Sequence, residues 1–377
     1  MIETVLVKTK KQQKQFIDFP LYLYKDCPYF VPPLYGDEKK IFRQDYMYYD
    51  QCEAVYYLAC KDGEVVGRIS VILQRASNEK RGEKRVRFTR FDSIDDAEVA
   101  KALFSAVEEW ALEKGMDTVC GPLGFSDLER EGLLIEGFDQ LSTFEEQYNY
   151  EYYPRLVEAC GYGKEADWNE SRISLPDEPD DRLEKSAELL MKRYNLHKGP
   201  AKNINEFIDK YADGFFDLLD RSYENVYGTV PFTDRMKASL ITSFRLLLDV
   251  EHVAVALNEK DEPVLLGLCF PSISEAVKKS NGKLTPAAIV RILRARKHPK
   301  VIDFGLVGVD PDYANKGVGA IAAAEIMRML RKDGMEYAET NLNLEDNHQI
   351  QNMWKRFKRV IHKRRRSYVK KLTEKAE

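Results

Sequence analysis

A strand-like apolar run in the second half of the chain leads into a glycine-rich turn and then into an apolar helix. Residues 301–310 read VIDFGLVGVD, residues 311–320 read PDYANKGVGA, and the helical pattern IAAAEIMRML follows. A chain that passes through Gly317 and Gly319 into a helix presents backbone N–H groups that have no acceptor inside the helix. Glycine also lets a ligand approach the backbone closely, and Lys316 and the helix dipole add positive potential. These features predict an anion site, and a plain helix-start turn is the alternative.

The segment VGVDPDYANKGVGA resembles motif A of the GNAT acyl-CoA N-acyltransferases, a strand followed by Val-x-Pro-x-Tyr-x-x-x-Gly-x-Gly. In that family the loop holds the pyrophosphate of coenzyme A. The resemblance implies that the second half of the chain, from about Leu183 to Leu372, binds acetyl-CoA. Ala314 replaces the family's usual Arg or Gln, so one side-chain contact is absent while the backbone amides remain. The implied cofactor contacts are the backbone of Val307 and Val309 along the pantetheine arm and the loop residues Asn315, Lys316, Gly317, Val318, Gly319 and Ala320.

A second family element, an Asn followed seven residues later by a Tyr on a helix, corresponds in this chain to Asn347 and Trp354. The resemblance implies a cofactor contact for Asn347. The family's Tyr often protonates the departing thiolate, and an indole N–H cannot serve as a comparable acid, so the general acid is unassigned.

The general base is inferred in the same way. An alkylamine acceptor has a pKa of ~10 and must lose a proton before it can attack a thioester. In histone-modifying members of the family the base is a Glu on the strand before motif A, and the matching position in this chain is Asp303. Glu339, in YAETNL, is the second candidate. The alternative for Asp303 is that it merely begins the strand and faces water, since a useful base needs burial to raise its pKa. Backbone N–H groups near Val309 are expected to stabilise the thioester oxyanion.

Two copies of one order of elements are expected to position these residues. Residues 56–73 and 252–270 both read as β-hairpins, with turns at Asp62-Gly63 and near Lys260-Asp261. After each hairpin come a strand, an amphipathic helix ended by glycine, a further strand and a further helix. The sequence therefore predicts an α/β fold with two tandem GNAT-like mixed sheets flanked by helices.

The clearest break between the copies is SLPDEPDD, residues 174–181. We therefore expect a degenerate GNAT-like domain over residues 1–175 and an acyl-CoA-binding GNAT domain over residues 182–377. The first copy enters its helix through RVRFTRFDSIDD, without Gly-x-Gly, and is not expected to hold a pyrophosphate. Its glycine- and acid-rich segment from Cys120 to Asp139 is expected to be a long loop, either a wall of the acceptor pocket or an ordered structural loop.

Composition narrows the class of protein. A chain of 377 residues with 44% hydrophobic residues can bury two cores. There is no signal-peptide pattern and no window of ~18 apolar residues, so a cytoplasmic protein without a membrane partner is expected. Six scattered cysteines without a C-x-x-C pair, and dispersed histidines, indicate neither a disulfide framework nor a metal site. The oligomeric state has no signature in the sequence.

Charge supports a rival function. Lys355 to Lys371 carries ten Lys or Arg and no acid, which could neutralise phosphates of RNA or DNA. However, this run reads as the closing strand of the second domain, where outward cations protect a sheet edge, and the net charge of −4 argues against a dedicated nucleic-acid protein.

The predicted function is an N-acetyltransferase that moves an acetyl group from acetyl-CoA to a primary amine of a small molecule or peptide. Two alternatives remain open. The departures at Ala314 and Trp354 allow a catalytically silent acyl-CoA-binding sensor. The tandem arrangement with one degenerate copy also resembles the Fem-type aminoacyl transferases, which would contact RNA through the basic C-terminus.

Overall fold

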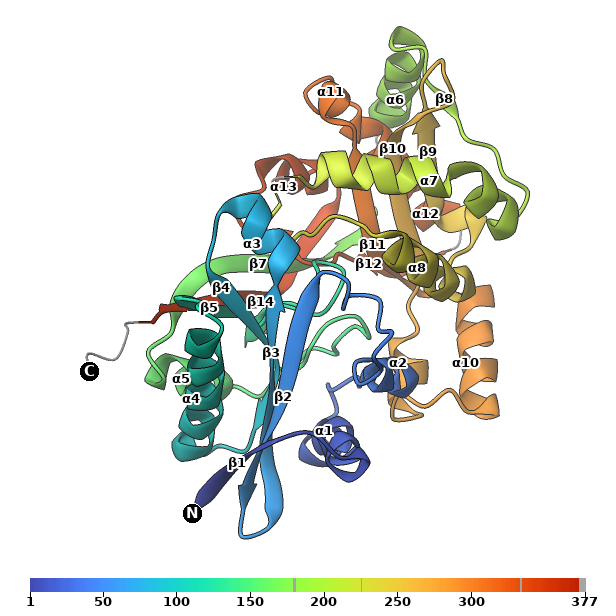
Figure 1. Ribbon diagram of the computed structural model, residues 1–377. Helices are drawn as coiled ribbons and strands as arrows, with labels where there is room; N and C mark the ends of the chain where they lie inside the picture. Colours follow the sequence, from blue (N-terminus) through green and yellow to red (C-terminus); the bar gives the residue numbers. More distant parts are fainter. Residues whose placement is uncertain (179–180, 225, 333, 373–377) are drawn as a thin grey trace. The chain divides into compact units, whose positions relative to one another are not determined.

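Figure 1 shows the computed structural model, which describes residues 1–178, 181–224, 226–332 and 334–372. The chain forms two compact units, and each combines a mixed sheet with flanking helices, as predicted. The units are not continuous in sequence. The first contains Met1–Asn169, Ile273–Ile292 and the residues from Lys363 onward, and the second contains Glu170–Ser272 and Leu293–His362.

The first unit begins with a strand and a capped helix and continues through a long hairpin. Its elements, in chain order, are β1 (Ile2–Leu6), α1 (Lys10–Leu23), α2 (Tyr35–Lys40), β2 (Cys52–Lys61), β3 (Glu64–Gln74), α3 (Arg75–Arg81), β4 (Arg85–Ser93), α4 (Ala97–Glu113), β5 (Thr118–Gly121), β6 (Leu133–Glu136), α5 (Tyr153–Ala159) and α9 (Ser274–Lys278). Strands β1 to β4 pair antiparallel in sequence order, and β4 pairs parallel with β5 over three residues.

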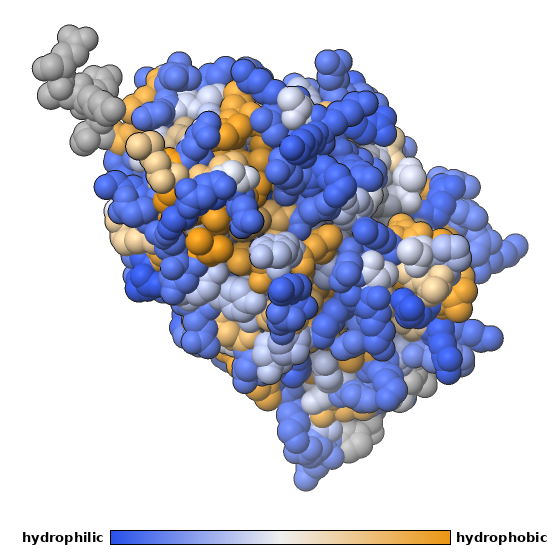
Figure 2. Space-filling view, turned by 90° about the horizontal axis from the view of Figure 1, so that it is seen from below, coloured by the Kyte–Doolittle hydropathy of each residue, from blue (hydrophilic) through white to orange (hydrophobic). Residues whose placement is uncertain are grey.

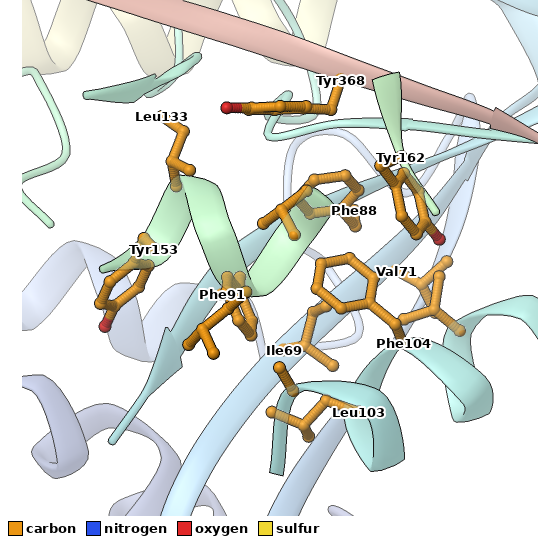
Figure 3. Packing of buried hydrophobic residues seen from close by; sticks show 14 of the residues in the cluster. Ile69, Val71, Phe88, Phe91, Leu103, Phe104, Leu133, Tyr153, Tyr162 and Tyr368 are labelled. Carbon is orange, nitrogen blue, oxygen red and sulfur yellow. The ribbon is translucent and has the colours of Figure 1, made fainter. Parts of the chain in front are cut away.

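The core of the first unit forms where α4 packs against β3 and β4. Helix α4 has its apolar residues on one face, which buries Leu103 and Phe104 completely or almost completely. Figure 3 shows Phe104 beside Phe88 and Phe91 of β4, with ring centroids 5.0 and 4.9 Å from that of Phe104. Such edge-to-face and tilted pairs add to the free energy of area burial.

The second unit repeats this order with additional helices. Its elements are α6 (Asp181–Arg193), β8 (His197–Lys198), α7 (Ile204–Ser222), α8 (Asp234–Leu247), a 3₁₀ turn (Val250–His252), β9 (Val253–Leu257), β10 (Pro263–Pro271), β11 (Val301–Val309), α11 (Pro311–Ala314), α12 (Gly319–Lys332), β12 (Tyr337–Glu339), β13 (Asn343–Leu344) and α13 (His348–Trp354). Strands β8 to β11 pair antiparallel in sequence order, and β11 pairs parallel with β12. Its core gathers the apolar face of α12 against β10 and β11.

Three elements have residues in both units: β7 (Gly163–Ser174), α10 (Pro286–Lys297) and β14 (Lys358–Lys371). The prediction that the basic run forms the closing strand of the second domain is wrong. Residues 364–371 of β14 pair with β5 and β6 of the first unit, where Tyr368 lies opposite Gly121. The functional division into residues 1–175 and 182–377 stays a prediction, and residues 179 and 180 of the predicted boundary lie outside the described residues.

The predicted hairpins are confirmed. Asp62 and Gly63 form a two-residue turn with φ of 53° and 84° between β2 and β3. The second hairpin turns through residues 258–262, where Asp261 has φ of 62°. In the described part of the chain, none of the helices has the length and apolar character needed to cross a bilayer.

Candidate functional site

Strands β11 and β12 of the second unit pair side by side only briefly. Their parallel register joins Val301 to Tyr337 and ends at Asp303, which lies opposite Glu339. Beyond this point β11 continues to Val309 and pairs with β10. In the part of the chain that the structure describes, the last six residues of β11 have no strand partner on the β12 side, and this places an extended backbone edge directly before the glycine loop.

The glycine loop connects β11 to α12 through the short helix α11. Asp310 caps α11 by accepting a hydrogen bond from the N–H of Asp312 at 2.9 Å. The N–H groups of Asn315 and Lys316 both donate to the carbonyl of Tyr313. The N–H of Ala320 likewise donates to a carbonyl within the loop, at 2.9 Å. Three of the amides predicted to bind the pyrophosphate are therefore used inside the loop.

The other three amides that were predicted to bind the pyrophosphate are not used in hydrogen bonds inside the loop. Among the described residues, the N–H groups of Gly317, Val318 and Gly319 have no hydrogen-bond acceptor. Val318 is fixed because its side chain is completely buried in the core of the second unit. Since these amides lie at the first turn of α12, the positive end of its helix dipole reinforces them. The sequence pattern locates the loop but not which of its amides remain available.

The two glycines of the loop have different physical roles. Gly317 has φ of +79°, a backbone conformation that side chains rarely adopt. Gly319 does not have a positive φ, and a Cβ added there would meet no atom within 4 Å. Gly319 thus leaves open space over the helix terminus. The ammonium of Lys316 lies 4.7 Å from the ring centre of Tyr313, so its charge is held close to the loop.

Asp303 and Glu339 are both buried, with 1% and 4% of their surface exposed. The alternative that Asp303 faces water is therefore wrong. Because the two carboxyl groups stand on neighbouring strands in register, they lie at the point where β11 and β12 stop pairing. Asp303 also affects the thiol of Cys269 on the neighbouring strand β10. Burial of this thiol is the larger cause that raises its pKa, and the negative charge of Asp303 is the second. Such a buried acidic pair has the character of a site that handles protons.

Two further side chains join the carboxyl pair, and the sequence pattern assigns neither of them a role. Arg172 of β7 lies opposite Glu339 in the sheet, with its Nε 3.6 Å from Oε2. His362 of β14 places its Nε2 3.0 Å from Oε1 of Glu339, and both side chains are at most 6% exposed. The histidines are too dispersed in sequence to indicate a site. The only available signal is that His362 interrupts a run of Lys and Arg.

The predicted contacts along β11 are partly occupied by the protein itself. The hydroxyl of Tyr223, after α7, donates to the carbonyl of Val307 at 3.0 Å. The side-chain amide of Asn341 donates to the carbonyl of Gly305 at 2.9 Å. Val309 is paired with Leu265 of β10 and is half-buried. A pantetheine arm along this edge would therefore meet two polar side chains beside the backbone.

Asn347 and Trp354 have clear structural roles. The Asn347 side chain is exposed and caps α13, accepting from the N–H of Ile350 at 3.2 Å. Trp354 is 1% exposed and donates its indole N–H to Oδ1 of Asn343 at 2.7 Å. Its ring also packs against Phe304, with centroids 5.3 Å apart. The role of Asn347 toward a cofactor stays a prediction.

The corresponding helix start in the first unit carries an acid instead of glycines. Asp96 caps α4 by accepting from the N–H of Glu98 at 3.0 Å, and it also pairs with Lys61 at 3.3 Å. The negative carboxylate thus stands where the second unit has open amides. The expectation that the first copy holds no pyrophosphate stays a prediction.

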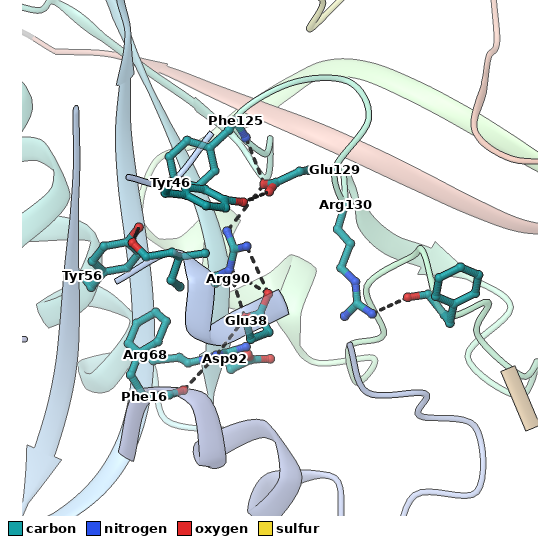
Figure 4. A network of polar contacts seen from close by, with 12 residues as sticks. Phe16, Glu38, Tyr46, Tyr56, Arg68, Arg90, Asp92, Phe125, Glu129 and Arg130 are labelled. Carbon is teal, nitrogen blue, oxygen red and sulfur yellow. Dashed lines mark hydrogen bonds and ion pairs between the residues drawn. The ribbon is translucent and has the colours of Figure 1, made fainter. Parts of the chain in front are cut away.

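The predicted long loop from Cys120 to Asp139 contains β6 and is tied to a buried charge network, shown in Figure 4. Glu129 of this loop accepts from the hydroxyl of Tyr46 at 2.7 Å and lies 3.8 Å from Arg90. Arg90 in turn makes a two-point contact with Glu38. The contacts suit the interpretation as an ordered structural loop, and a role as a wall of the acceptor pocket stays a prediction.

The charges of this network are mutually compensated. Burial by itself would raise the pKa of Glu38, but the guanidinium groups of Arg90 and Arg68 lower it to about 2. Arg68 is anchored on its other side by Asp92 at 2.8 Å. Within the described ranges, no group of three or more His, Cys, Asp or Glu side chains is arranged to hold a metal ion.

Comparison with solved structures shows the fold. A tandem GNAT protein from the clavulanic acid biosynthesis pathway superposes with a TM-score of 0.56 at 13% identity, covering 98% of each chain. A GCN5-related glucosamine N-acetyltransferase region of a fungal β-N-acetylglucosaminidase superposes with a TM-score of 0.54 at 11% identity, covering 98% of this chain and 38% of the other. The predicted fold class is therefore confirmed.

Two curated proteins are similar over almost the whole chain. Protein YghO of Escherichia coli (strain K12) is 28% identical over 380 residues, 97% of this chain and 95% of its own. The bacterial ceramide synthase of Caulobacter vibrioides (strain NA1000 / CB15N) is 26% identical over 341 residues, 89% of this chain and 87% of its own. No family model matches the chain.

Proposed function

Since this chain has the tandem GNAT fold, we propose that it is an acyltransferase that moves an acyl group from acyl-coenzyme A to an amine. The observation that carries the proposal is the set of three open amides, Gly317 to Gly319, at the start of α12 beside the unpaired edge of β11. Such a terminus suits a pyrophosphate because N–H groups and the helix dipole converge there. The sequence prediction of binding through Asn315 to Ala320 is thereby narrowed to three amides, with Lys316 adding charge.

The proposed chemistry needs one proton acceptor. The amine nitrogen attacks the thioester carbonyl carbon, a C–N bond forms, the C–S bond breaks, and the amine proton passes to a carboxylate. Asp303 is our proposed acceptor because it is buried at the end of the β11–β12 pairing. The departing thiolate takes a proton from solvent or from the carboxyl group of Asp303, which has just received the amine proton. Trp354 has no part in this step because its N–H is held by Asn343.

Glu339 is the second candidate base, and the structure adds a partner for it. A carboxylate beside an imidazole can orient the ring for proton transfer. Glu339 and His362, 3.0 Å apart, form such a pair. In this version of the mechanism His362 receives the proton and Glu339 positions it.

The acyl chain and the acceptor define two versions of the proposal. The sequence prediction names acetyl-CoA and a primary amine. The likeness to a bacterial ceramide synthase favours a second version, with a long acyl chain and a long-chain amino alcohol as acceptor. Both versions use the same loop and the same carboxylates, so one assay series separates them.

The RNA-dependent alternative has less support in the structure. Arg366 and Lys370 of the basic run pair with Asp167 and Glu108, respectively, at 2.7 Å. Cations already compensated in this way contribute less to phosphate binding. The alternative of a catalytically silent sensor is tested by measuring whether the wild-type protein turns over any donor and acceptor pair.

The test follows release of free thiol from acetyl-CoA and palmitoyl-CoA, each with a panel of polyamines, amino acids, peptide N-termini and sphinganine. We expect one donor and acceptor pair to be turned over by the wild-type protein. Asp303→Asn should lower kcat by ~100- to 10,000-fold and leave donor affinity unchanged, because the donor rests on backbone amides. The matched control is Asp209→Asn, the same change at an exposed position of α7, which should keep full activity.

Glu339→Gln, His362→Gln and their double variant distinguish the two bases. If Glu339 acts through His362, the single variants should lose similar activity and the double variant little more. Full activity in Asp303→Asn together with a large loss in the other two would transfer the role of base to the Glu339–His362 pair. Donor binding without turnover of any acceptor would favour the sensor.

A further inference from the structure

Helix α10 exposes an unusual number of large apolar side chains. Ile289, Val290 and Leu293 are 44%, 65% and 48% exposed, and Leu284 in the turn before the helix is 46% exposed. Nine large apolar residues in the described chain are this exposed, and four of them lie within these ten positions. Figure 2 shows one face of the protein, on which hydrophobic residues lie at several places among the hydrophilic ones.

These side chains form one stripe along the helix. At 100° per residue, Ile289, Leu293 and Val290 fall within an arc of about 100°. The helix is attached to the protein by another face, where Ala288 and Ile292 are at most 3% exposed. The outward stripe therefore is not the face that packs against the core.

The surroundings of the stripe are strongly basic. Residues 273–300 contain eight Lys or Arg and a single acid, Glu275, whereas the whole chain has a net charge of −4. Arg291, Arg294 and Lys297 of α10 are exposed, and among the described residues none of them has an ion-pair partner. The helix thus combines exposed aliphatic side chains with uncompensated cations.

We propose that α10 docks the protein on an anionic phospholipid surface, with Ile289, Val290 and Leu293 inserted between the headgroups. An amphipathic helix with aliphatic residues on one face and Lys or Arg beside them lies in the plane of the interface. Anionic headgroups complement the three cations, each of which adds to binding while it stays near the surface. This departs from the sequence-based expectation of no membrane partner, and it does not depend on the proposed function.

The same charges disfavour a second copy of the chain as the partner. Two α10 helices facing each other across a two-fold axis would bring Arg294 and Lys297 of both copies together. Protein interfaces also take aromatic anchors at their centre, and lysine is depleted there. The stripe of α10 is entirely aliphatic.

The test is flotation of the 377-residue chain with vesicles of phosphatidylglycerol and phosphatidylethanolamine, compared with pure phosphatidylcholine vesicles. Wild-type protein should float with the anionic vesicles at about 0.05 M NaCl and dissociate as salt rises, because surface charge is screened. Arg294→Gln with Lys297→Gln should lower the partition coefficient by about 25-fold, at about fivefold for each cation. Ile289→Ser with Val290→Ser should lower it by about tenfold or more.

Two matched controls separate the patch from general charge and hydrophobicity. Lys10→Gln with Lys11→Gln removes the same charge from exposed positions on α1, and Leu189→Ser removes an exposed apolar side chain from α6. Both should bind vesicles like the wild type. Circular dichroism and thermal unfolding of each variant show that it is folded.

The proposal is overturned if wild-type protein does not float with anionic vesicles, or if the control variants lose binding as much as the α10 variants. It is also overturned if Ile289→Ser with Val290→Ser leaves vesicle binding unchanged and instead converts a dimer to a monomer in sedimentation experiments. That outcome would assign the stripe to contact between copies.

Discussion

Replacement of Gly319 by valine should block ligand binding at the glycine loop without changing the stability of the fold. A Cβ at this position meets no protein atom within 4 Å, and the backbone needs no positive φ. Valine is also a better helix former than glycine by a few tenths of a kcal/mol. The free energy of unfolding should therefore stay within about 0.5 kcal/mol of the wild-type value. The open space around the Cβ position of Gly319 is the space that a bound pyrophosphate would occupy.

The expected loss of affinity follows from the three open amides. A hydrogen bond to a charged acceptor contributes about 1.5–3 kcal/mol, and a valine side chain over the terminus should prevent at least two of them. The dissociation constant for acyl-CoA should then rise by at least about 100-fold. Isothermal calorimetry on the folded variant measures this change.

Two other glycines serve as controls. Gly36→Val makes the same substitution in α2 of the first unit, also with no atom within 4 Å, and should not change affinity. Gly317→Ala places a side chain at φ of +79° and should cost about 1–2 kcal/mol of stability, unlike Gly319→Val. Unchanged acyl-CoA affinity in folded Gly319→Val would refute the assignment of this loop.

The first unit, Trp354 and Glu38 each allow a further prediction. Titration should give one acyl-CoA per chain, because Asp96 fills the matching helix start in the first unit; two equivalent sites would contradict this. Trp354→Phe should lower stability by about 1 kcal/mol, through loss of the bond to Asn343, yet keep kcat within about threefold, and a hundredfold loss in folded protein would make Trp354 part of the mechanism. Glu38 has a folded pKa of about 2 against 4.5 unfolded, so its contribution, on the order of 3 kcal/mol, is complete above pH 4.5 and is lost as the pH falls to 2. Urea unfolding should show the gap between wild type and Glu38→Gln shrinking over that range, and a gap independent of pH would contradict the attribution of the low pKa to Arg90 and Arg68.

Much of the local structure is predictable from the sequence because it depends on neighbouring residues. The Asp62-Gly63 turn is specified by the preference of both residues for positive φ. The ends of α4 and α12 are marked by Gly115 and Gly334, which have φ of 72° and 60°. The loop from Pro311 to Ala320 is likewise a local pattern.

Which segments of the chain belong to which unit cannot be predicted from such local patterns. Residues 273–292 and the end of β14 belong to the first unit although they follow the second copy of the hairpin in sequence. Their position is set by strand pairing and packing with residues more than 100 positions away. One such contact is the side-chain hydroxyl of Ser274, which accepts from the N–H of Phe144 at 3.0 Å. Hydrophobic periodicity identifies a strand but not its partner.

The candidate site shows the same limit. Asp303 and Glu339 can each be identified from the sequence, but their alignment in adjacent strands is a property of register. Arg172 and His362 join Glu339 from β7 and β14, so only the folded sheet brings them together. The distinction between used and open amides in the glycine loop likewise depends on the hydrogen bonds of the folded loop.

The central claim is that the start of α12 holds the pyrophosphate of an acyl-CoA donor. A crystal structure of the protein with coenzyme A tests it most directly. Pyrophosphate oxygens should lie within hydrogen-bond distance of the N–H groups of Gly317, Val318 and Gly319, with the pantetheine arm along β11 toward Asp303. Coenzyme A bound elsewhere on the chain, with no contact to these three amides, would contradict the assignment of the loop.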